Sequence, residues 1–316
     1  MPKRVVLLGQ PVTHSLSEAL QQAAFEAAGI DARYEPIDTP TVDLIDAVAA
    51  LRGDEYLGAN IGHPHKDRVA SMLDRLTEEA QVTGAVDTIT CDGDQLVGHN
   101  IDVIAFKPAL EELVGNQKMP RNAVVVGAGG GGRAAIYALI QAGFQNVALF
   151  NRHLHRGERL VKHFARSAAH MELKARPWHE SVIEAELAKT DILINASAMG
   201  SDPDETPIPA ELLPPDILVL DLHVVPEETR LLREAKAAGA TKVMNGDVML
   251  IDQTAAAFTL WTGEQAPLDV IKKQLKASRN KPDVPVPPAE ERANGEPAAE
   301  EPATEAGATH EAGAAE

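Results

Sequence analysis

The sequence predicts an α/β protein of two domains with mainly parallel sheets. Short runs of β-branched and apolar residues alternate with amphipathic stretches along the chain, which is the pattern of strand–helix–strand units. One of these runs leads directly into a glycine-rich loop at residues 127–132. The chain has 316 residues, more than an average domain, and this length favours two domains over one.

Seven segments have the composition of strands. They are rich in Val, Ile, Leu and Tyr and are separated by turn residues or amphipathic stretches. We expect strands at residues 4–9, 32–38, 56–61, 122–128, 146–151, 192–197 and 217–222. The chain shows no internal repeat.

Helices are expected between these strands and again after the last one. The clearest begins with a capping box, Ser15 and Glu18, and stops at Gly29. Its apolar face is formed by Leu16, Leu20, Ala23 and Ala24. Residues 246–263 and 267–279 carry further helical patterns, so helical chain continues after the strands end.

Charge and cysteine content exclude several classes of function. With 47 acidic and 29 basic side chains the formal net charge is -18, which repels nucleic acid and anionic membrane surfaces. Cys91 is the sole cysteine, so no internal disulfide or thiolate metal cluster can form, and we expect a cytoplasmic protein. The first apolar run is broken by Gly9 and Pro11, too early for a signal peptide, and no other run is long enough to span a membrane.

The composition changes sharply after residue 279. Residues 280–316 contain no Leu, Ile, Phe, Met or aromatic residue, and residues 281–316 hold nine acidic and two basic side chains. Such a segment cannot bury enough apolar surface to offset the entropy of ordering. We therefore expect a disordered acidic tail that solvates the protein, with binding of a partner as the alternative.

The most specific local motif is a dinucleotide-binding loop. Gly127, Gly129 and Gly132 follow a predicted strand and open an amphipathic helix; the first glycine allows a tight turn, the second a close approach to pyrophosphate, the third close helix packing. The complete predicted loop is Gly127, Ala128, Gly129, Gly130, Gly131 and Gly132. An ordinary glycine-rich connection is the alternative.

The end of the next predicted strand indicates which dinucleotide binds. A carboxylate there would accept the ribose hydroxyls of NAD, whereas cationic side chains accommodate the 2′-phosphate of NADP. The chain has Asn151, Arg152 and His153 at this point, with Arg156 close behind and no acid. NADP is therefore the expected cofactor; the alternative is that both arginines are merely solvated.

A nicotinamide cofactor requires a second site that holds the substrate and exchanges a proton. Ser15 and Ser17 stand at a predicted helix N-terminus, where hydroxyls and free N–H groups can bind a carboxylate, although a capping role for Ser15 is the simpler interpretation. In ANIGHPHKDR (59–68), His63 and His65 lack an obvious third ligand, so we expect no metal site. Residue spacing alone leaves the role of Lys66 open.

The order of motifs resembles the shikimate dehydrogenase family over nearly all of residues 3–279. The motifs are GQPVTHSLS (9–17), ANIGHPHKD (59–67), GAVDTI (84–89), GHNIDVIAF (98–106), VVGAGGGGRAA (125–135), NRHLHR (151–156), ILINASAMGS (192–201) and NGDVMLIDQTAAAFTLWTG (245–263). The resemblance implies a substrate-binding catalytic domain (1–105) completed by helices at 247–279, a Rossmann domain for NADP (106–246), and a tail (280–316). It also implies NADP-dependent, reversible reduction of 3-dehydroshikimate to shikimate in aromatic amino-acid biosynthesis, by a monomer or homodimer.

Carried over position by position, the resemblance assigns roles to individual residues. Lys66 and Asp102 become the catalytic pair; a surface lysine and a helix-capping Asp are the alternatives. Substrate contacts are assigned to Ser15, Ser17, Asp87, Asn100 and Gln253, and further cofactor contacts to Ala196, Met199 and Gly246.

The chain departs from the family pattern mainly on the substrate side. Gly62 stands for a threonine, Asp87 for an asparagine and Val224 for a tyrosine. Other departures are Glu18, Gln21, Gln22, His63, Ile101 and Val103. Lost hydrogen-bond partners weaken discrimination among substrates, so the alternatives are a paralogue acting on quinate, an aminated analogue or another polyol acid, and a non-catalytic NADPH-binding protein.

Overall fold

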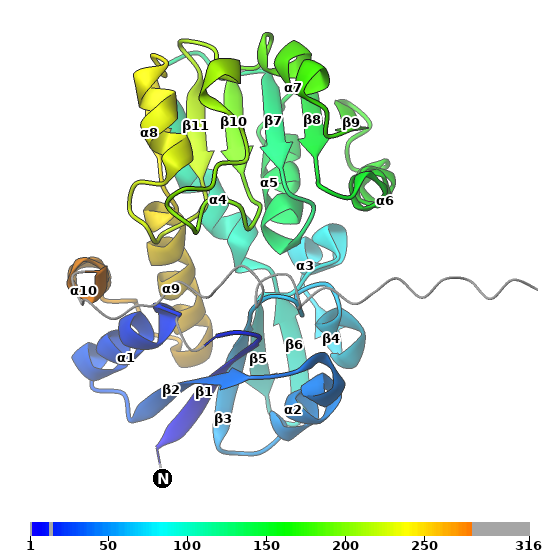
Figure 1. Cartoon of the computed structure of the whole chain (residues 1–316). Coiled ribbons are helices and arrows are strands. Elements are labelled where there is room, and N and C mark those ends of the chain that lie inside the picture. The colour runs from blue at the N-terminus through cyan, green and yellow to red at the C-terminus, as the bar shows by residue number, and fades with distance from the viewer. Residues whose placement is uncertain (1, 13–14, 280–316) are drawn as a thin grey trace, which may run out of the picture.

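The computed structural model describes residues 2–12 and 15–279. The predicted disordered tail at 280–316 lies outside the described residues. Two six-stranded sheets lie in separate halves of the molecule, one from residues 3–99 and one from residues 122–244 (Figure 1). The predicted α/β fold with mainly parallel sheets is confirmed.

The first sheet has the strand order β2-β1-β3-β5-β6-β4. Its strands are β1 (Lys3–Gly9), β2 (Ala32–Asp38), β3 (Tyr56–Ile61), β4 (Arg75–Leu76), β5 (Thr88–Asp92) and β6 (Gln95–His99). β1 pairs in parallel with both β2 and β3, whereas β5 runs antiparallel to β3 and β6. Successive residues of β1 alternate between two cores, which is the period-two pattern of a sheet covered on both faces.

The second sheet is parallel throughout, with the order β12-β11-β10-β7-β8-β9. Its strands are β7 (Asn122–Val126), β8 (Asn146–Phe150), β9 (Glu172–Arg176), β10 (Ile192–Asn195), β11 (Leu218–Asp221) and β12 (Lys242–Met244). The chain begins at β7 in the middle, builds outward to β9, and then returns to build from β10 to β12. This reversal is the topological switch point at which doubly wound sheets bind ligands.

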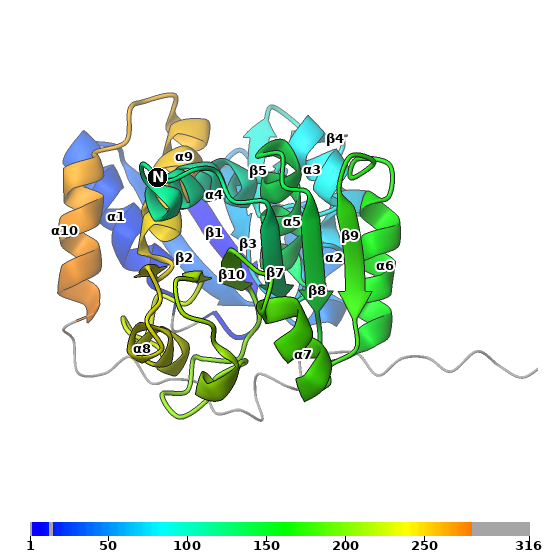
Figure 2. The same ribbon diagram turned by 90° about the horizontal axis from the view of Figure 1, so that it is seen from above.

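Helices cover both faces of the second sheet. The helices of the described residues are α1 (Ser17–Ala28), α2 (Leu44–Ala50), α3 (Glu78–Thr83), α4 (Ile101–Val114), α5 (Gly130–Gln141), α6 (Leu154–Phe164), α7 (Glu180–Leu187), α8 (Arg230–Ala237), α9 (Asp247–Thr262) and α10 (Leu268–Arg279). Short 3₁₀ turns lie at Thr41–Asp43, Val69–Met72 and Ala210–Leu212. α4, α5 and α6 pack on one face, and α7 and α8 on the other (Figure 2).

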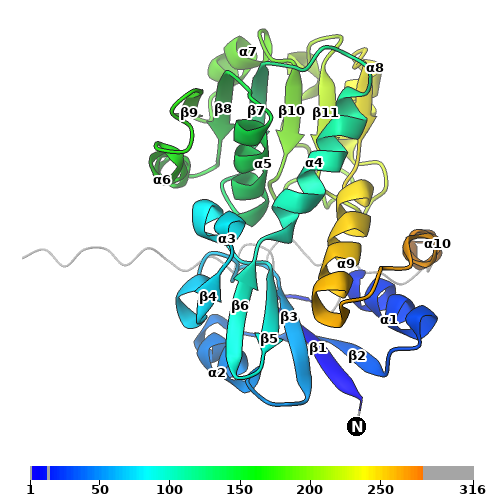
Figure 3. The same cartoon turned by 180° about the vertical axis from the view of Figure 1, so that it is seen from behind.

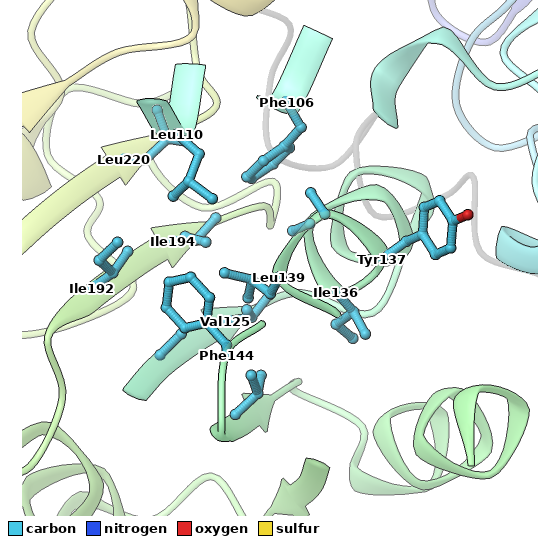
Figure 4. Packing of buried hydrophobic residues seen from close by; sticks show 14 of the residues in the cluster. Phe106, Leu110, Val125, Ile136, Tyr137, Leu139, Phe144, Ile192, Ile194 and Leu220 are labelled. Carbon is cyan, nitrogen blue, oxygen red and sulfur yellow. The ribbon is translucent and has the colours of Figure 1, made fainter. Parts of the chain in front are cut away.

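The core between α4, α5 and the second sheet is apolar and tightly filled. Phe106 and Leu110 from α4 meet Ile136 and Leu139 from α5 over the strands (Figure 4). Full burial of such side chains stabilises the fold by about 1.5–3 kcal/mol each. The first turn of α4 begins directly after β6, so this packing fixes the start of α4 relative to both sheets.

The chain returns to the first sheet through its last two helices. α9 runs beside α4 between the two halves of the molecule, and α10 lies against α1 (Figure 3). Trp261 of α9 donates its indole N–H to the carbonyl of Ile89 at 3.0 Å. Gly58 leaves room for this contact, because a Cβ there would lie 2.5 Å from the indole nitrogen. Residues 247–262 therefore complete the wall of the N-terminal half.

Two local predictions need correction. The capping box at Ser15 and Glu18 is wrong: α1 begins at Ser17, Leu16 occupies the cap position, and no side chain caps the helix. The Ser15 hydroxyl instead accepts the backbone N–H of Ser17 at 3.2 Å. Four predicted strands also end earlier than expected, at Val126, Phe150, Asn195 and Asp221, because the chain turns there into its loops.

Candidate functional site

Lys66 and Asp102 form an ion pair. Lys66 follows β3, and its Nζ donates to Oδ2 of Asp102, in the first turn of α4, at 2.6 Å. The Lys66 side chain is 26% exposed and the Asp102 side chain 7% exposed. Burial lowers the pKa of Lys66, but the carboxylates of Asp102 and Asp87 together outweigh it and hold the pKa above its ordinary value.

Asp87 lies beside this pair and is 3% exposed. Its Oδ1 accepts the backbone N–H of Ile101 at 2.9 Å and the hydroxyl of Thr88 at 2.9 Å, and its Oδ2 accepts the backbone N–H of Asp102 at 2.8 Å. Burial and the charge of Asp102 raise the pKa of Asp87 to about 7, against the opposing effect of Lys66 and the two backbone N–H groups.

A cavity of about 420 Å³ opens beside the ion pair. Six of the predicted catalytic and substrate-binding residues line it: Ser15, Ser17, Lys66, Asp87, Asp102 and Gln253. Gln253, from α9, donates its Nε2 to Oδ1 of Asp102 at 3.0 Å, so both carboxylate oxygens of Asp102 are held by side chains. The volume is in the range of small-molecule sites.

Asn100 is the predicted substrate contact that the structure places away from this cavity. It is 1% exposed, and its Oδ1 accepts the backbone N–H of Val103 as the N-cap of α4. Its Nδ2 donates to the hydroxyl of Thr83 and the carbonyl of Ala85, each at 3.0 Å. These bonds use both N–H groups of the amide and one lone pair of its oxygen, so Asn100 supports the helix start.

A buried polar chain that the sequence did not reveal leads from Tyr34 to Asp87 in the cavity lining. The Tyr34 hydroxyl donates to Oδ1 of Asn60 at 2.8 Å, and Nδ2 of Asn60 donates to the hydroxyl of Thr88 at 3.0 Å, which leads on to Asp87. Asn60 also lines the cavity. A polar residue in the middle of the apolar strand at 56–61 was the signal that could have revealed it.

Gln21 of α1 is a second missed residue of the cavity lining. It is 1% exposed, and its Nε2 donates to the carbonyl of Thr254 at 3.0 Å. Within the described part of the chain its Oε1 has no hydrogen-bond partner. A buried carbonyl oxygen without a donor is costly, so this atom is suited to accept a bond from a bound molecule.

The glycine-rich loop has the geometry that a dinucleotide pyrophosphate requires. Gly127 has a φ of 107°, and a Cβ there would lie 2.5 Å from the carbonyl oxygen of Ala196. A Cβ at Gly132 would lie 2.1 Å from the carbonyl oxygen of Gly127, whereas a Cβ at Gly129 would meet nothing within 4 Å. α5 starts at Gly130 with no side-chain cap, so its first N–H groups are available for an anion.

The other predicted cofactor residues surround the same edge of the sheet. Asn151, after β8, accepts the backbone N–H of Ala128 at 3.2 Å, which ties the loop to the end of the next strand. Ala196 and Met199 follow β10, and Gly246 follows β12, with its N–H bonded to the carbonyl of His223 at 2.8 Å. Arg152 is exposed and Arg156 half-buried at the start of α6. The first N–H groups of α5 and the two arginines after β8 fit the phosphate groups of NADP.

No group of three or more His, Cys, Asp and Glu side chains in residues 2–12 and 15–279 is arranged to hold a metal ion. His65 is fully buried and its Nε2 lies 2.7 Å from the carbonyl oxygen of Thr39, so it serves the packing of the loop before Lys66. Among the described helices none is long and apolar enough to cross a membrane.

Sequence comparison with known families identifies three matching regions. Residues 7–89 match the shikimate dehydrogenase substrate binding domain, residues 110–203 the shikimate / quinate 5-dehydrogenase family, and residues 248–276 the shikimate 5'-dehydrogenase C-terminal domain. The shikimate dehydrogenase (NADP(+)) of Symbiobacterium thermophilum is 38% identical over 281 residues, which cover 88% of this chain and 95% of that protein.

Solved structures agree with these matches. Shikimate 5-dehydrogenase from Thermus thermophilus, in complex with NADP(H) and shikimate, is 36% identical with a TM-score of 0.76, and covers 87% of this chain and 99% of its own. Quinate dehydrogenase from Corynebacterium glutamicum, in complex with NAD, is 30% identical with a TM-score of 0.78, over 87% and 99% of the two chains. The resemblance predicted from the motifs is confirmed.

Proposed function

Because the chain belongs to the shikimate dehydrogenase family, we propose that it catalyses the NADP-dependent, reversible reduction of 3-dehydroshikimate to shikimate. The observation that supports this activity most directly is the Lys66–Asp102 pair at 2.6 Å on the wall of the cavity that Ser15 and Ser17 also line. Such a pair can exchange the proton of a substrate hydroxyl, which is what alcohol oxidation requires.

One side chain of the cavity transfers the proton and two others hold it in place. In reduction, Lys66 gives its proton to the carbonyl oxygen as that oxygen gains negative charge, and the neutral amine is then reprotonated from solvent. Asp102 holds the Lys66 ammonium, and Gln253 holds Asp102 from the opposite side. When bound, the reduced cofactor supplies the hydride to the carbonyl carbon; in oxidation both transfers reverse.

We propose that Ser15 and Ser17 bind the substrate carboxylate. Both residues line the cavity at the start of α1, where the Ser15 hydroxyl accepts the N–H of Ser17 and the cap residue Leu16 makes no side-chain bond. Hydroxyl groups and free N–H groups at a helix N-terminus favour an anion. The ring hydroxyls would then lie towards Lys66, Asp102 and Gln253, across the same cavity.

Quinate is the second candidate substrate. Gly62 lines the cavity without a side chain, and a Cβ there would only make ordinary contact, 3.4 Å from Cγ1 of Val12. Gly62 thus adds no side chain to the cavity wall, which favours a polyol acid with more substituents than shikimate. The 30% identity to a quinate dehydrogenase supports quinate as the second candidate.

An assay of the full chain at 340 nm with NADP or NAD, against shikimate, quinate and related polyol acids, tests the proposal. NADP-linked oxidation of shikimate with the largest kcat/KM supports it. Preference for quinate or another acid would make the chain a paralogue, and the absence of turnover despite NADPH binding would favour the non-catalytic alternative. The oligomeric state and a cytoplasmic location stay predictions.

A further inference from the structure

Asp87 links the segment before β5 to the start of α4, the helix that carries Asp102. It precedes β5, whereas Ile101 and Asp102 open α4, 14 and 15 residues further along the chain. The two backbone N–H groups that its carboxylate accepts are among the first four of α4, which have no partner within the helix. A carboxylate at this point also interacts favourably with the helix dipole.

The backbone N–H and both carboxylate oxygens of Asp102 are therefore hydrogen-bonded. Its N–H is bound by Asp87, its Oδ2 by Lys66 and its Oδ1 by Gln253. A shift of the first turn of α4 would displace the carboxylate that orients Lys66. The bonds from Asp87 therefore hold the turn from which the Asp102 carboxylate projects.

The charge of Asp87 acts on the pair as well. The charged groups that face it are Asp102 of α4 and Lys66 from the turn after β3. Asp87 is a source of the raised pKa of Lys66, second to Asp102 among the charges. One buried carboxylate binds the ammonium and a second acts on it through its charge, and the loss of either one leaves the proton on Lys66 less stable.

We propose, on the premise of the function given above, that Asp87 is a positioning residue for the Lys66–Asp102 pair: its carboxylate anchors the start of α4 and its negative charge stabilises the Lys66 ammonium. Asparagine, the residue of the family pattern, could accept only through its single amide oxygen and would carry no charge. The chain thus tunes its proton-exchanging lysine with a group that the motif comparison assigned to the substrate.

The test compares Asp87→Asn and Asp87→Glu in the full chain, by the pH dependence of kcat for shikimate oxidation with NADP between pH 7 and 11. Oxidation requires neutral Lys66. Removal of the negative charge lowers the pKa of Lys66. In Asp87→Asn the rising limb of the plot of kcat against pH should therefore move to lower pH, by about one unit. Asp87→Glu keeps the charge in a displaced position, so its kcat should fall while its limb stays within a few tenths of the wild-type limb.

Asn100→Ala is the matched control, because it removes the neutral cap of the same helix. It should lower the melting temperature without moving the limb. An unshifted limb in Asp87→Asn would overturn the proposal. So would a change confined to the KM for shikimate, since that result would make Asp87 a substrate contact.

A second measurement separates this proposal from the proposed function. Competitive acetylation with acetic anhydride, read by mass spectrometry at Lys66, gives the pKa of the amine without any turnover. A lower Lys66 pKa in Asp87→Asn than in the wild-type protein supports the proposal even if shikimate is not the substrate. Equal pKa values would overturn it, whereas failure of the wild-type protein to oxidise shikimate would count against the proposed function alone.

Discussion

Lys66 lies directly against Gly130, the first residue of the helix that follows the cofactor loop. A Cβ at Gly130 would be 2.7 Å from Cδ and 3.4 Å from Cβ of Lys66. The position of the Lys66 side chain, which follows β3 of the first sheet, therefore requires that residue 130 of α5 has no side chain. This contact explains how proton exchange and cofactor binding can meet at one place.

Gly130→Ala should therefore displace the Lys66 side chain with little effect on the stability of the fold. The added methyl group has to push the middle of the Lys66 side chain aside, and small displacements of a reacting group lower rates steeply. We expect kcat to fall by about tenfold to a hundredfold, with a melting temperature close to that of the wild-type protein. Steady-state kinetics and thermal unfolding of the same preparation check this.

Gly129→Ala provides the contrast. A Cβ at Gly129 meets nothing within 4 Å, in the space from which a pyrophosphate would approach. This variant should raise the KM for NADP and change kcat less than Gly130→Ala does. If the two variants gave the same pattern of KM and kcat, the contact with Lys66 would not matter for catalysis.

Arg152 should select NADP over NAD. It is exposed at the start of the segment after β8, where a 2′-phosphate would be bound. Loss of a hydrogen bond to a charged group costs about 1.5–3 kcal/mol, so Arg152→Ala should raise the KM for NADP by about tenfold to a hundredfold and leave that for NAD nearly unchanged. Arg159→Ala, an exposed arginine further along α6, is the control. Parallel losses with both cofactors would refute the assignment.

Cys91 should react slowly as long as the protein is folded. Burial raises the pKa of its thiol to about 11, and the thiol donates to the carbonyl of Leu51 at 3.2 Å. Since the thiolate is the reactive form, the rate with a disulfide reagent should rise about tenfold per pH unit from pH 7 to 9.5 in the native protein. In denaturant the same rate should level off above about pH 9, because the free thiol has an ordinary pKa. A native rate that also levels off would contradict the raised pKa.

Much of the fold was predictable because its strands are apolar. All seven predicted strands exist, and the glycine loop lies where strand, turn and helix were expected. The missed strands carry too little apolar signal: β9 reads ELKAR at a sheet edge, and β5 and β6 form a hairpin with several polar residues. β4 and β12, of two and three residues, are too short to show periodicity.

The contacts within the site were harder to predict from the sequence than the strands. The ion pair joins residues 36 positions apart, and no spacing rule predicts such a contact; only the family resemblance suggested it. The resemblance could not reveal that Asn100 is consumed by the start of α4, or that Asp87 binds the backbone of Asp102. Both facts depend on how β5, β6 and α4 meet, which is a property of the folded chain.

The role of Lys66 is tested by comparing wild-type protein and Lys66→Ala in the NADP-linked oxidation of shikimate, followed at 340 nm. We predict ready turnover by the wild-type protein and a fall in kcat by about 10² to 10⁴ in the variant, the usual contribution of a general acid–base group, with unchanged NADPH affinity by fluorescence titration. Lys107→Ala, on the exposed face of α4, should behave as wild type. Wild-type turnover in Lys66→Ala would contradict the central claim that this lysine exchanges the substrate proton.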